Sequence, residues 1–258
     1  MNDAVVITSR DNPLLVRLRR LAREPAATRK FGWVWLEGEH LCRAALERGV
    51  RPRLALLAEH ASADAAWVEL AGSAARVHVV ADALWKSLST LESPSPLGFV
   101  FDLPVAPALQ PDAPSVVLDR VQDAGNVGSI LRSAAALGVT QVVALAGSAG
   151  LWTPKVLRAA MGAHFALHLI DAAAPEQLAA LRVPLLATGS HDGVPLPQAR
   201  LPWPCAWVFG HEGQGVQPAL FARAALAVRI PQPGGEESLN VAAAAAICLY
   251  ESLRARGG

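Results

Sequence analysis

The pattern of apolar and polar positions in the second half of the chain predicts an α/β domain. Short apolar runs, typical of strands, alternate with longer segments whose apolar residues recur at helical spacing. The predicted strands are residues 115–118, 141–145, 165–170, 184–188, 206–209 and 227–230, and the predicted helices are 127–137, 154–161, 175–181 and 239–254. This alternation predicts a mostly parallel sheet covered by helices, and such sheets bind ligands at the carboxyl ends of their strands.

The first 102 residues predict a second, smaller α/β domain. Between Pro13 and Ala22, leucines fall on one side of a helix and arginines on the other, which gives this helix a basic face. Predicted strands follow at 33–36, 54–58 and 77–80, with a helical segment after the first and another after the second.

A proline-rich segment separates these two regions. Residues 103–114 hold four prolines and no plausible helix or strand, which is typical of a semi-rigid linker. We therefore predict an N-terminal domain at 1–102, a linker at 103–114 and a C-terminal domain at 115–258.

The composition indicates a folded protein, because 52% of the 258 residues are apolar. The net charge is only +1, but seven basic residues and two acidic ones lie between Arg10 and Lys30. Since a guanidinium group pairs with phosphate through two parallel hydrogen bonds, this cluster favours a phosphate-bearing partner. The twenty arginines against three lysines of the whole chain indicate codon bias instead.

The cysteines and the apolar runs bear on location. Cys42, Cys205 and Cys248 show neither the spacing of a metal site nor that of paired disulfides. The chain starts without the basic residues and apolar run of a secretory signal, and its longest apolar stretches are too short to span a bilayer. We expect a cytoplasmic protein that binds neither a metal nor a membrane.

The first of three glycine-containing motifs is NVGSILR, residues 126–132, which follows the strand that ends near Asp119. Asn126 and Arg132 are six residues apart, so they would not lie on one helical face if both were helical. Their side chains could still converge if Asn126 lies in the loop before the helix. The alternative is structural, with Asn126 as a helix cap and Arg132 in solvent. The glycine fingerprint of dehydrogenases, the P-loop and the nucleophile elbow of α/β-hydrolases are all absent from the chain.

The second and third motifs follow two later strands. FGHEGQGV, residues 209–216, places Glu212 at the apex of a glycine-rich loop, and the alternative interpretation is a tight turn with an exposed acid. In the third, IPQPGGEESLNVAAA, residues 230–244, Ser238 is predicted to cap the last helix and Asn240 to lie near its first turn. That helix is apolar on every face, which predicts that it is buried or packed against another surface.

Taken together, the three motifs resemble those of the SpoU/TrmH family of RNA ribose 2′-O-methyltransferases, in the SPOUT superfamily. The stretches ITSRDNPLLVRLRRLAR, LEGEHLCRAAL and SPSPLGFV resemble the substrate-binding domain of ribosomal RNA members. The matching positions of the three motifs are Asn126, Gly128, Arg132, Gly210, Glu212, Gly215, Pro231, Gly235, Ser238, Leu239, Asn240 and Val241.

The resemblance implies an α/β fold: a C-terminal trefoil-knot methyltransferase domain preceded by a small, L30e-like, RNA-binding domain. It also implies S-adenosylmethionine as cofactor, RNA as substrate and a homodimer. The cofactor residues it implies are Phe209, Gly210, Glu212, Gly215, Ile230, Gln232, Ser238, Leu239 and Asn240. Candidate RNA contacts are Arg17, Arg20, Arg29, Lys30, Lys155 and Arg158, and for the last two a solvated helix face or a dimer contact is an equal alternative.

The residues implied for catalysis are Arg132, Asn126, Glu212, Ser238 and Asn240. In the family, the residue at the position of Arg132 is held to activate the ribose 2′-hydroxyl. Because arginine stays protonated in proteins, we favour orientation of that hydroxyl and stabilisation of the developing alkoxide. The separate N-terminal domain favours 23S ribosomal RNA as substrate. The alternatives are a transfer RNA ribose methyltransferase and a non-catalytic RNA-binding protein of the same fold.

Overall fold

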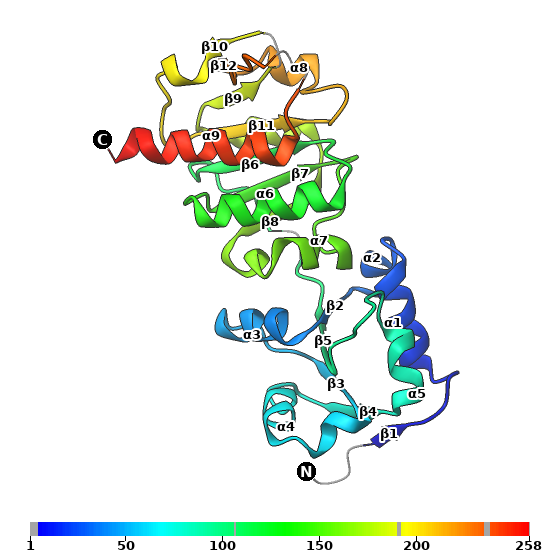
Figure 1. Ribbon diagram of the computed structural model, residues 1–258. Coiled ribbons are helices and arrows are strands. Elements are labelled where there is room, and N and C mark those ends of the chain that lie inside the picture. The colour runs from blue at the N-terminus through cyan, green and yellow to red at the C-terminus, as the bar shows by residue number, and fades with distance from the viewer. Residues whose placement is uncertain (1–4, 106, 190–191, 235–237, 258) are drawn as a thin grey trace. The chain divides into compact units, whose positions relative to one another are not determined.

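The computed structural model describes residues 5–105, 107–189, 192–234 and 238–257. These form two compact units (Figure 1). Unit 1 comprises Met1–Val105 together with Trp152–Phe165, and unit 2 comprises Ala106–Leu151 together with Ala166–Gly258. The segment Trp152–Phe165 therefore packs with unit 1 although the chain enters it from unit 2. The predicted domains 1–102 and 115–258, and the linker at 103–114, stay a prediction.

Unit 1 is built on a mixed sheet in the order β1-β4-β3-β5-β2. Its β1, β4 and β3 run parallel, while β5 is antiparallel to both β3 and β2. The strands are β1 (Val5–Ile7), β2 (Trp33–Glu37), β3 (Leu54–Ala58), β4 (Val77–Val80) and β5 (Leu97–Asp102). The helices are α1 (Pro13–Arg23), α2 (Ala27–Phe31), α3 (Glu39–Glu47), η1 (Glu59–Ala63), α4 (Ala65–Ala71), α5 (Asp82–Trp85), η2 (Lys86–Leu88) and α7 (Pro154–Ala160), followed by η3 (Ala163–Ala166) at the boundary of the two units.

Both faces of the unit 1 sheet are buried, which explains why its strands read as unbroken apolar runs. On β3, Leu54 and Leu56 join the core that contains the buried leucines of α1, whereas Leu57 joins the core beneath α3. Alternate residues of a strand point to opposite faces, so one short run supplies both cores. The predicted amphipathic helix is confirmed, since α1 buries Leu15, Leu18 and Leu21 and leaves Arg17 and Arg23 exposed.

Unit 2 contains a seven-stranded sheet within its described residues, in the order β10-β12-β9-β11-β6-β7-β8, with every pair parallel. This confirms the predicted parallel sheet. The strands are β6 (Ser115–Asp119), β7 (Gln141–Leu145), β8 (His168–Ala173), β9 (Leu185–Thr188), β10 (Val194–Pro195), β11 (Ala206–Gly210) and β12 (Leu226–Arg229). The helices are α6 (Ala124–Ala136), η4 (Pro175–Ala180), η5 (Leu196–Gln198), α8 (Pro218–Phe221) and α9 (Val241–Arg256).

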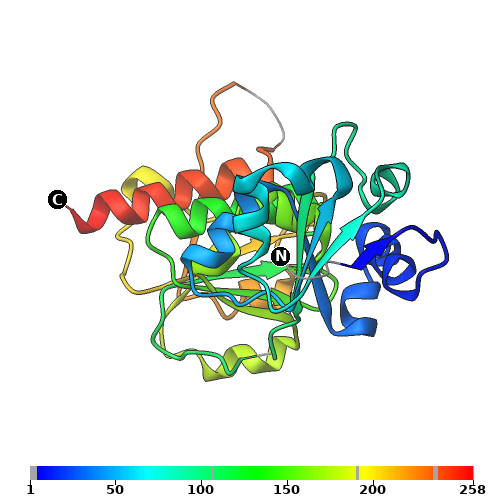
Figure 2. The same cartoon turned by 90° about the horizontal axis from the view of Figure 1, so that it is seen from below.

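Helices α6 and α9 lie side by side (Figure 1, Figure 2). The last helix was predicted to be buried or packed against another surface. Its buried side is Ala245, Cys248, Leu249 and Ser252, a stripe at helical spacing. Its other side exposes Ile247, Tyr250 and Leu253, so one apolar face of α9 is left uncovered in the single chain. Within the part of the chain that the structure describes, no helix has the length and apolar character of a membrane span.

Several predicted elements of unit 2 differ from the structure in their bounds or type. Residues Ala163–Ala166 form a turn of 3₁₀ helix, so the strand predicted at 165–170 begins only at His168. The helix predicted at 175–181 is also of the 3₁₀ type. The last helix starts at Val241, two residues later than predicted, because its cap is a different residue from the expected one.

Candidate functional site

The first two motifs meet at the carboxyl edge of the unit 2 sheet. Strands β6 and β11 are paired neighbours, and their last residues, Asp119 and Gly210, lie opposite each other in the register. The loops that follow therefore start side by side, as expected of a ligand site in a parallel sheet.

The loop after β11, residues 211–217, is folded back tightly on the strand that precedes it. His211 and Gly215 exchange two backbone hydrogen bonds, of 3.1 and 2.8 Å between nitrogen and oxygen. A Cβ atom on Gly210 would overlap the backbone of Gly215 and Val216. Gly215 itself has a φ of +68°, a conformation that favours glycine. We call these residues the β11 loop.

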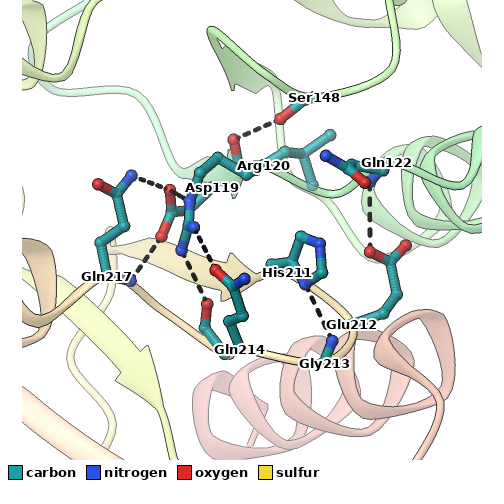
Figure 3. Close-up of polar contacts among 11 residues, drawn as sticks. Asp119, Arg120, Gln122, Ser148, His211, Glu212, Gly213, Gln214 and Gln217 are labelled. Atoms are coloured by element: carbon teal, nitrogen blue, oxygen red, sulfur yellow. Dashed lines mark hydrogen bonds and ion pairs between the residues drawn. The ribbon is translucent and has the colours of Figure 1, made fainter.

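An ion pair between the buried Asp119 and the half-buried Arg120 holds the β11 loop from the β6 side (Figure 3). The fully buried carboxylate of Asp119 accepts hydrogen bonds from the backbone nitrogen of Gln217, at 2.6 Å, and from its Nε2, at 2.5 Å. Arg120 donates from Nε to Asp119 at 3.2 Å and from Nη1 to Gln214 Oε1 at 2.8 Å.

Arg120 adopts a φ of +60°, a strained conformation for a residue with a side chain. Sequence reasoning missed both residues of this ion pair. Their only signal was an Asp-Arg pair directly at the end of a predicted strand.

Glu212 joins all three motifs. Its Oε1 accepts a hydrogen bond from Asn126 Nδ2 at 3.1 Å, and Asn126 Oδ1 in turn accepts one from Asn240 Nδ2 at 2.9 Å. The backbone nitrogens of Asp123 and Gln122 also donate to the carboxylate, at 3.1 and 3.3 Å. Partial burial alone would raise the pKa of Glu212, but these hydrogen bonds outweigh it and lower the pKa below its ordinary value.

The structure corrects the predicted place of Asn126. Asp123 caps α6 by accepting from the backbone nitrogen of Asn126 at 2.8 Å, so the helix begins at Ala124 and Asn126 lies in its first turn rather than in the preceding loop. Arg132 lies in the same helix, six residues on, and points about 120° away from Asn126. Arg132 is exposed and makes no hydrogen bond or ion pair with another described residue. Within unit 2, therefore, Arg132 does not belong to the amide–carboxylate network.

The third motif contributes the side chain of Asn240 to that network. Asn240 caps α9 by accepting from the backbone nitrogens of Ala242 and Ala243, at 2.9 and 3.2 Å, so the prediction that Ser238 is the cap is wrong. Ser238 and Leu239 are exposed, and Ile230 and Gln232 are half-buried after β12. Gly235 lies outside the described residues.

Two predicted cofactor residues, Gln232 and Phe209, have side chains in different surroundings. The Oε1 of Gln232 is buried, and no described group donates a hydrogen bond to it. An orphaned acceptor of this kind is uncommon in native proteins and indicates a missing partner. Phe209, also predicted to bind cofactor, is fully buried in β11 and stacks on Trp207, so its side chain belongs to the core.

The predicted RNA contacts all belong to unit 1. Arg17 and Arg20 lie on α1, Arg29 and Lys30 lie on α2, and Lys155 and Arg158 lie on α7. Burial raises the pKa of Glu37 at the end of β2, even though the hydroxyl of Ser89 donates to it and the charge of Arg158 opposes the shift. Arg158 therefore acts electrostatically on a buried acid of unit 1.

The stretch of sequence that contains this site matches the model of a known family. The model of the SpoU rRNA Methylase family covers residues 113–250, more than half of the chain and all three motifs. The chain belongs to the SpoU rRNA methylase family.

Similar proteins extend this likeness over nearly the whole chain. A Synechocystis protein described as an uncharacterized tRNA/rRNA methyltransferase is 33% identical, over 98% of this chain and 95% of that protein. The Bacillus subtilis 23S rRNA (guanosine(2553)-2′-O)-methyltransferase is 32% identical, over 67% of this chain and 71% of its own length. The crystal structure of an AdoMet-bound rRNA methyltransferase from Sinorhizobium meliloti has a TM-score of 0.85 and 26% identity, and covers 96% of this chain and 97% of that one.

Proposed function

We propose that this protein transfers the methyl group of S-adenosylmethionine to a ribose 2′-hydroxyl of 23S ribosomal RNA. The observation that carries the proposal is the hydrogen-bonded chain Glu212–Asn126–Asn240, in which each of the three family motifs supplies one side chain. The Bacillus subtilis relative is named for this reaction on 23S rRNA, and the Sinorhizobium meliloti structure is named as AdoMet-bound.

The residues at the carboxyl edge fit such a cofactor. The orphaned Oε1 of Gln232 can accept from an amino group of the ligand, and the backbone of the β11 loop is held in one shape. We assign cofactor binding to Gly210, Glu212, Gly215, Ile230, Gln232, Ser238, Leu239 and Asn240, with Phe209 acting through its backbone because its ring is in the core. When bound, S-adenosylmethionine supplies an electrophilic methyl group on a sulfonium.

Arg132 is the residue to which we assign the 2′-hydroxyl. Its guanidinium group is exposed and has no described partner, so it is available to hold the hydroxyl or an adjacent phosphate and to stabilise negative charge on the oxygen. Glu212 is a poor candidate for the base, because the hydrogen bonds that lower its pKa make its carboxylate a weaker proton acceptor. We assign Glu212, Asn126, Ser238 and Asn240 to positioning.

We further propose that two copies of the chain form a homodimer through α9. Its exposed Ile247, Tyr250 and Leu253 form an apolar strip that water disfavours and that a second copy would cover. A trefoil knot in unit 2, an L30e-like RNA-binding role for unit 1 and a cytoplasmic location belong to the same proposal.

The decisive experiment is transfer of labelled methyl from S-adenosylmethionine to ribosomal and transfer RNA, followed by alkaline hydrolysis. A 2′-O-methyl group removes the internal nucleophile, so we expect the label in an alkali-resistant dinucleotide from 23S RNA. Label confined to transfer RNA would show that transfer RNA, not ribosomal RNA, is the substrate. Label in mononucleotides would show that the enzyme methylates a base instead of the ribose. No label on RNA or on ribosomal particles would favour a binding protein.

Arg132→Ala tests the assigned role in the same assay. We expect turnover to fall at least about 100-fold, with S-adenosylmethionine affinity within about twofold of wild type. Near-normal turnover in this variant would remove Arg132 from the reaction.

A further inference from the structure

The basic surface of unit 1 contains a cluster in which arginines cover two aromatic rings. We call Arg17, Arg20, Phe31, Trp33 and Arg53 the arginine–aromatic patch. They come from α1, the end of α2, the start of β2 and the residue before β3. Since β2 and β3 are both antiparallel to β5, which lies between them, both strands begin at the same end of the sheet. All five lie within unit 1.

The arginines of the patch are ordered by the rings beneath them. The Cζ of Arg17 lies 5.9 Å from the ring centroid of Phe31 and 5.3 Å from that of Trp33. Arg20 adds a second contact to Phe31 at 5.2 Å, and Arg53 a second to Trp33, also at 5.2 Å. Each ring is thus contacted by two guanidinium groups within the range of cation–π attraction. These contacts hold long, flexible side chains in defined positions.

The guanidinium groups nevertheless remain open to a ligand. Arg17 is exposed, and the side chains of Arg20 and Arg53 keep 38% and 52% of their surface in solvent. Two carboxylates approach the patch, Glu24 on Arg20 and Asp102 on Arg53, both at 2.8 Å. The exposed neighbours Arg23, Arg29, Lys30 and Arg51 leave the surrounding surface strongly positive.

We propose that this patch binds an unpaired nucleotide of the RNA substrate, with its base stacked on a guanidinium plane and its phosphate held by the surrounding arginines. The inference rests on the proposed function and specifies which form of RNA unit 1 engages. A guanidinium group is planar, so its solvent side can stack on a base while its other side rests on a ring. Paired RNA hides the faces of its bases inside the helix, and a duplex would meet only the charge of this surface.

An arginine-to-lysine substitution separates stacking from charge, because lysine keeps the charge and loses the plane. The test variant is Arg17→Lys combined with Arg53→Lys. The matched control is Arg48→Lys, an exposed residue at the end of α3 that makes no described ring contact and does not belong to the arginines around the patch. Binding of the full-length protein is measured by fluorescence anisotropy, without S-adenosylmethionine. The two probes are a labelled, unstructured single-stranded RNA of about 12 nucleotides and a duplex of the same sequence.

We expect the double variant to bind the single strand about tenfold more weakly than wild type, the size of one lost base stack, and the duplex within about twofold. The control should match wild type on both probes, and the dependence of log Kd on log salt should be unchanged because no charge is lost. Thermal melting of the variants serves to show that they fold.

A double variant that binds the single strand as wild type does would overturn the proposal and leave only a charged surface. Equal losses on the single strand and the duplex would overturn it too. Methyl transfer by the wild-type enzyme is scored separately, so a protein that discriminates these probes yet methylates no RNA would refute the proposed function and keep this inference.

Discussion

Two segments follow strands at the carboxyl edge of the unit 2 sheet, the β11 loop from the second motif and the segment after β12 from the third. They differ in how many contacts with the rest of the protein fix their shape. The β11 loop, residues 211–217, is closed by its own backbone bridge and fastened from outside by the Asp119–Arg120 pair. The segment after β12 is described at 230–234 and again from Ser238. It has a buried Gln232 oxygen to which no described group donates, and Ser238 and Leu239 are exposed. We infer that the β11 loop is a preformed support, while the β12 segment receives its missing partners from the ligand.

The largest expected effect comes from Gly210→Ala. The added methyl group would overlap the backbone of Gly215 and Val216, so the β11 loop must open. We expect a loss of about 3 kcal/mol in the free energy of unfolding and at least about 100-fold in S-adenosylmethionine affinity, measured by urea denaturation and calorimetric titration.

Gly234→Ala in the β12 segment is the matched control, since no atom of the described residues lies within 4 Å of the position of an added Cβ. It should change the free energy of unfolding by less than about 0.5 kcal/mol. Similar losses in the free energy of unfolding for Gly210→Ala and Gly234→Ala would show that the β11 loop adapts as readily as the β12 segment.

Asp119→Asn comes second. The change keeps the shape but turns one oxygen into a donor that faces Gln217 or Arg120, so hydrogen bonds to a charged, buried group are lost. We expect a loss of about 2–3 kcal/mol in the free energy of unfolding and about tenfold in cofactor affinity.

Asp112→Asn provides the comparison, because Asp112 pairs with Arg182 in solvent, where 65% of its side-chain surface is exposed. That variant should cost about 1 kcal/mol or less. Equal costs for the two variants would mean that the Asp119–Arg120 pair does not fasten the loop.

Gln232→Leu should stabilise the free protein and weaken its binding of S-adenosylmethionine. Removing a buried oxygen that no described group satisfies is expected to raise the free energy of unfolding by up to about 1 kcal/mol without ligand. Affinity for S-adenosylmethionine should fall about fivefold, because the ligand loses its acceptor. Thermal melting with and without the cofactor measures both effects, and an unchanged ligand-induced shift would count against the assigned contact.

The smallest effect concerns pH. Because the folded-state pKa of Glu212 lies below its ordinary value of 4.5, the ionised carboxylate contributes stability above that pH and loses it as the pH falls through the folded value. The difference in free energy of unfolding between wild type and Glu212→Gln should therefore be constant from pH 7 to about 5 and shrink at lower pH. A difference that grows on acidification would show that the sign of the shift is wrong.

The local pattern of the sequence was enough to predict most of the regular structure. The strands at 54–58, 77–80 and 141–145 have the predicted bounds, because each is a mostly apolar run between polar turns. All residues of the strands at 54–58 and 141–145 are buried, and in the strand at 77–80 the last two are. The antiparallel β5 was not predicted from the pattern. Its course depends on pairing with β2 and β3, which lie far away in the chain.

The sequence by itself also determined the family, since three short motifs in the right order identify it even though each is weak alone. Only the tertiary structure decided how those motifs work together. Glu212 lies 86 residues from Asn126, and Asn126 lies 114 residues from Asn240, so no local rule could join them. The same holds for Asp119 and Gln217, 98 residues apart, whose buried hydrogen bonds form because parallel strands bring both loops to one edge of the sheet. Periodicity reports which side of an element is buried, whereas the partner of a polar side chain depends on packing between distant elements.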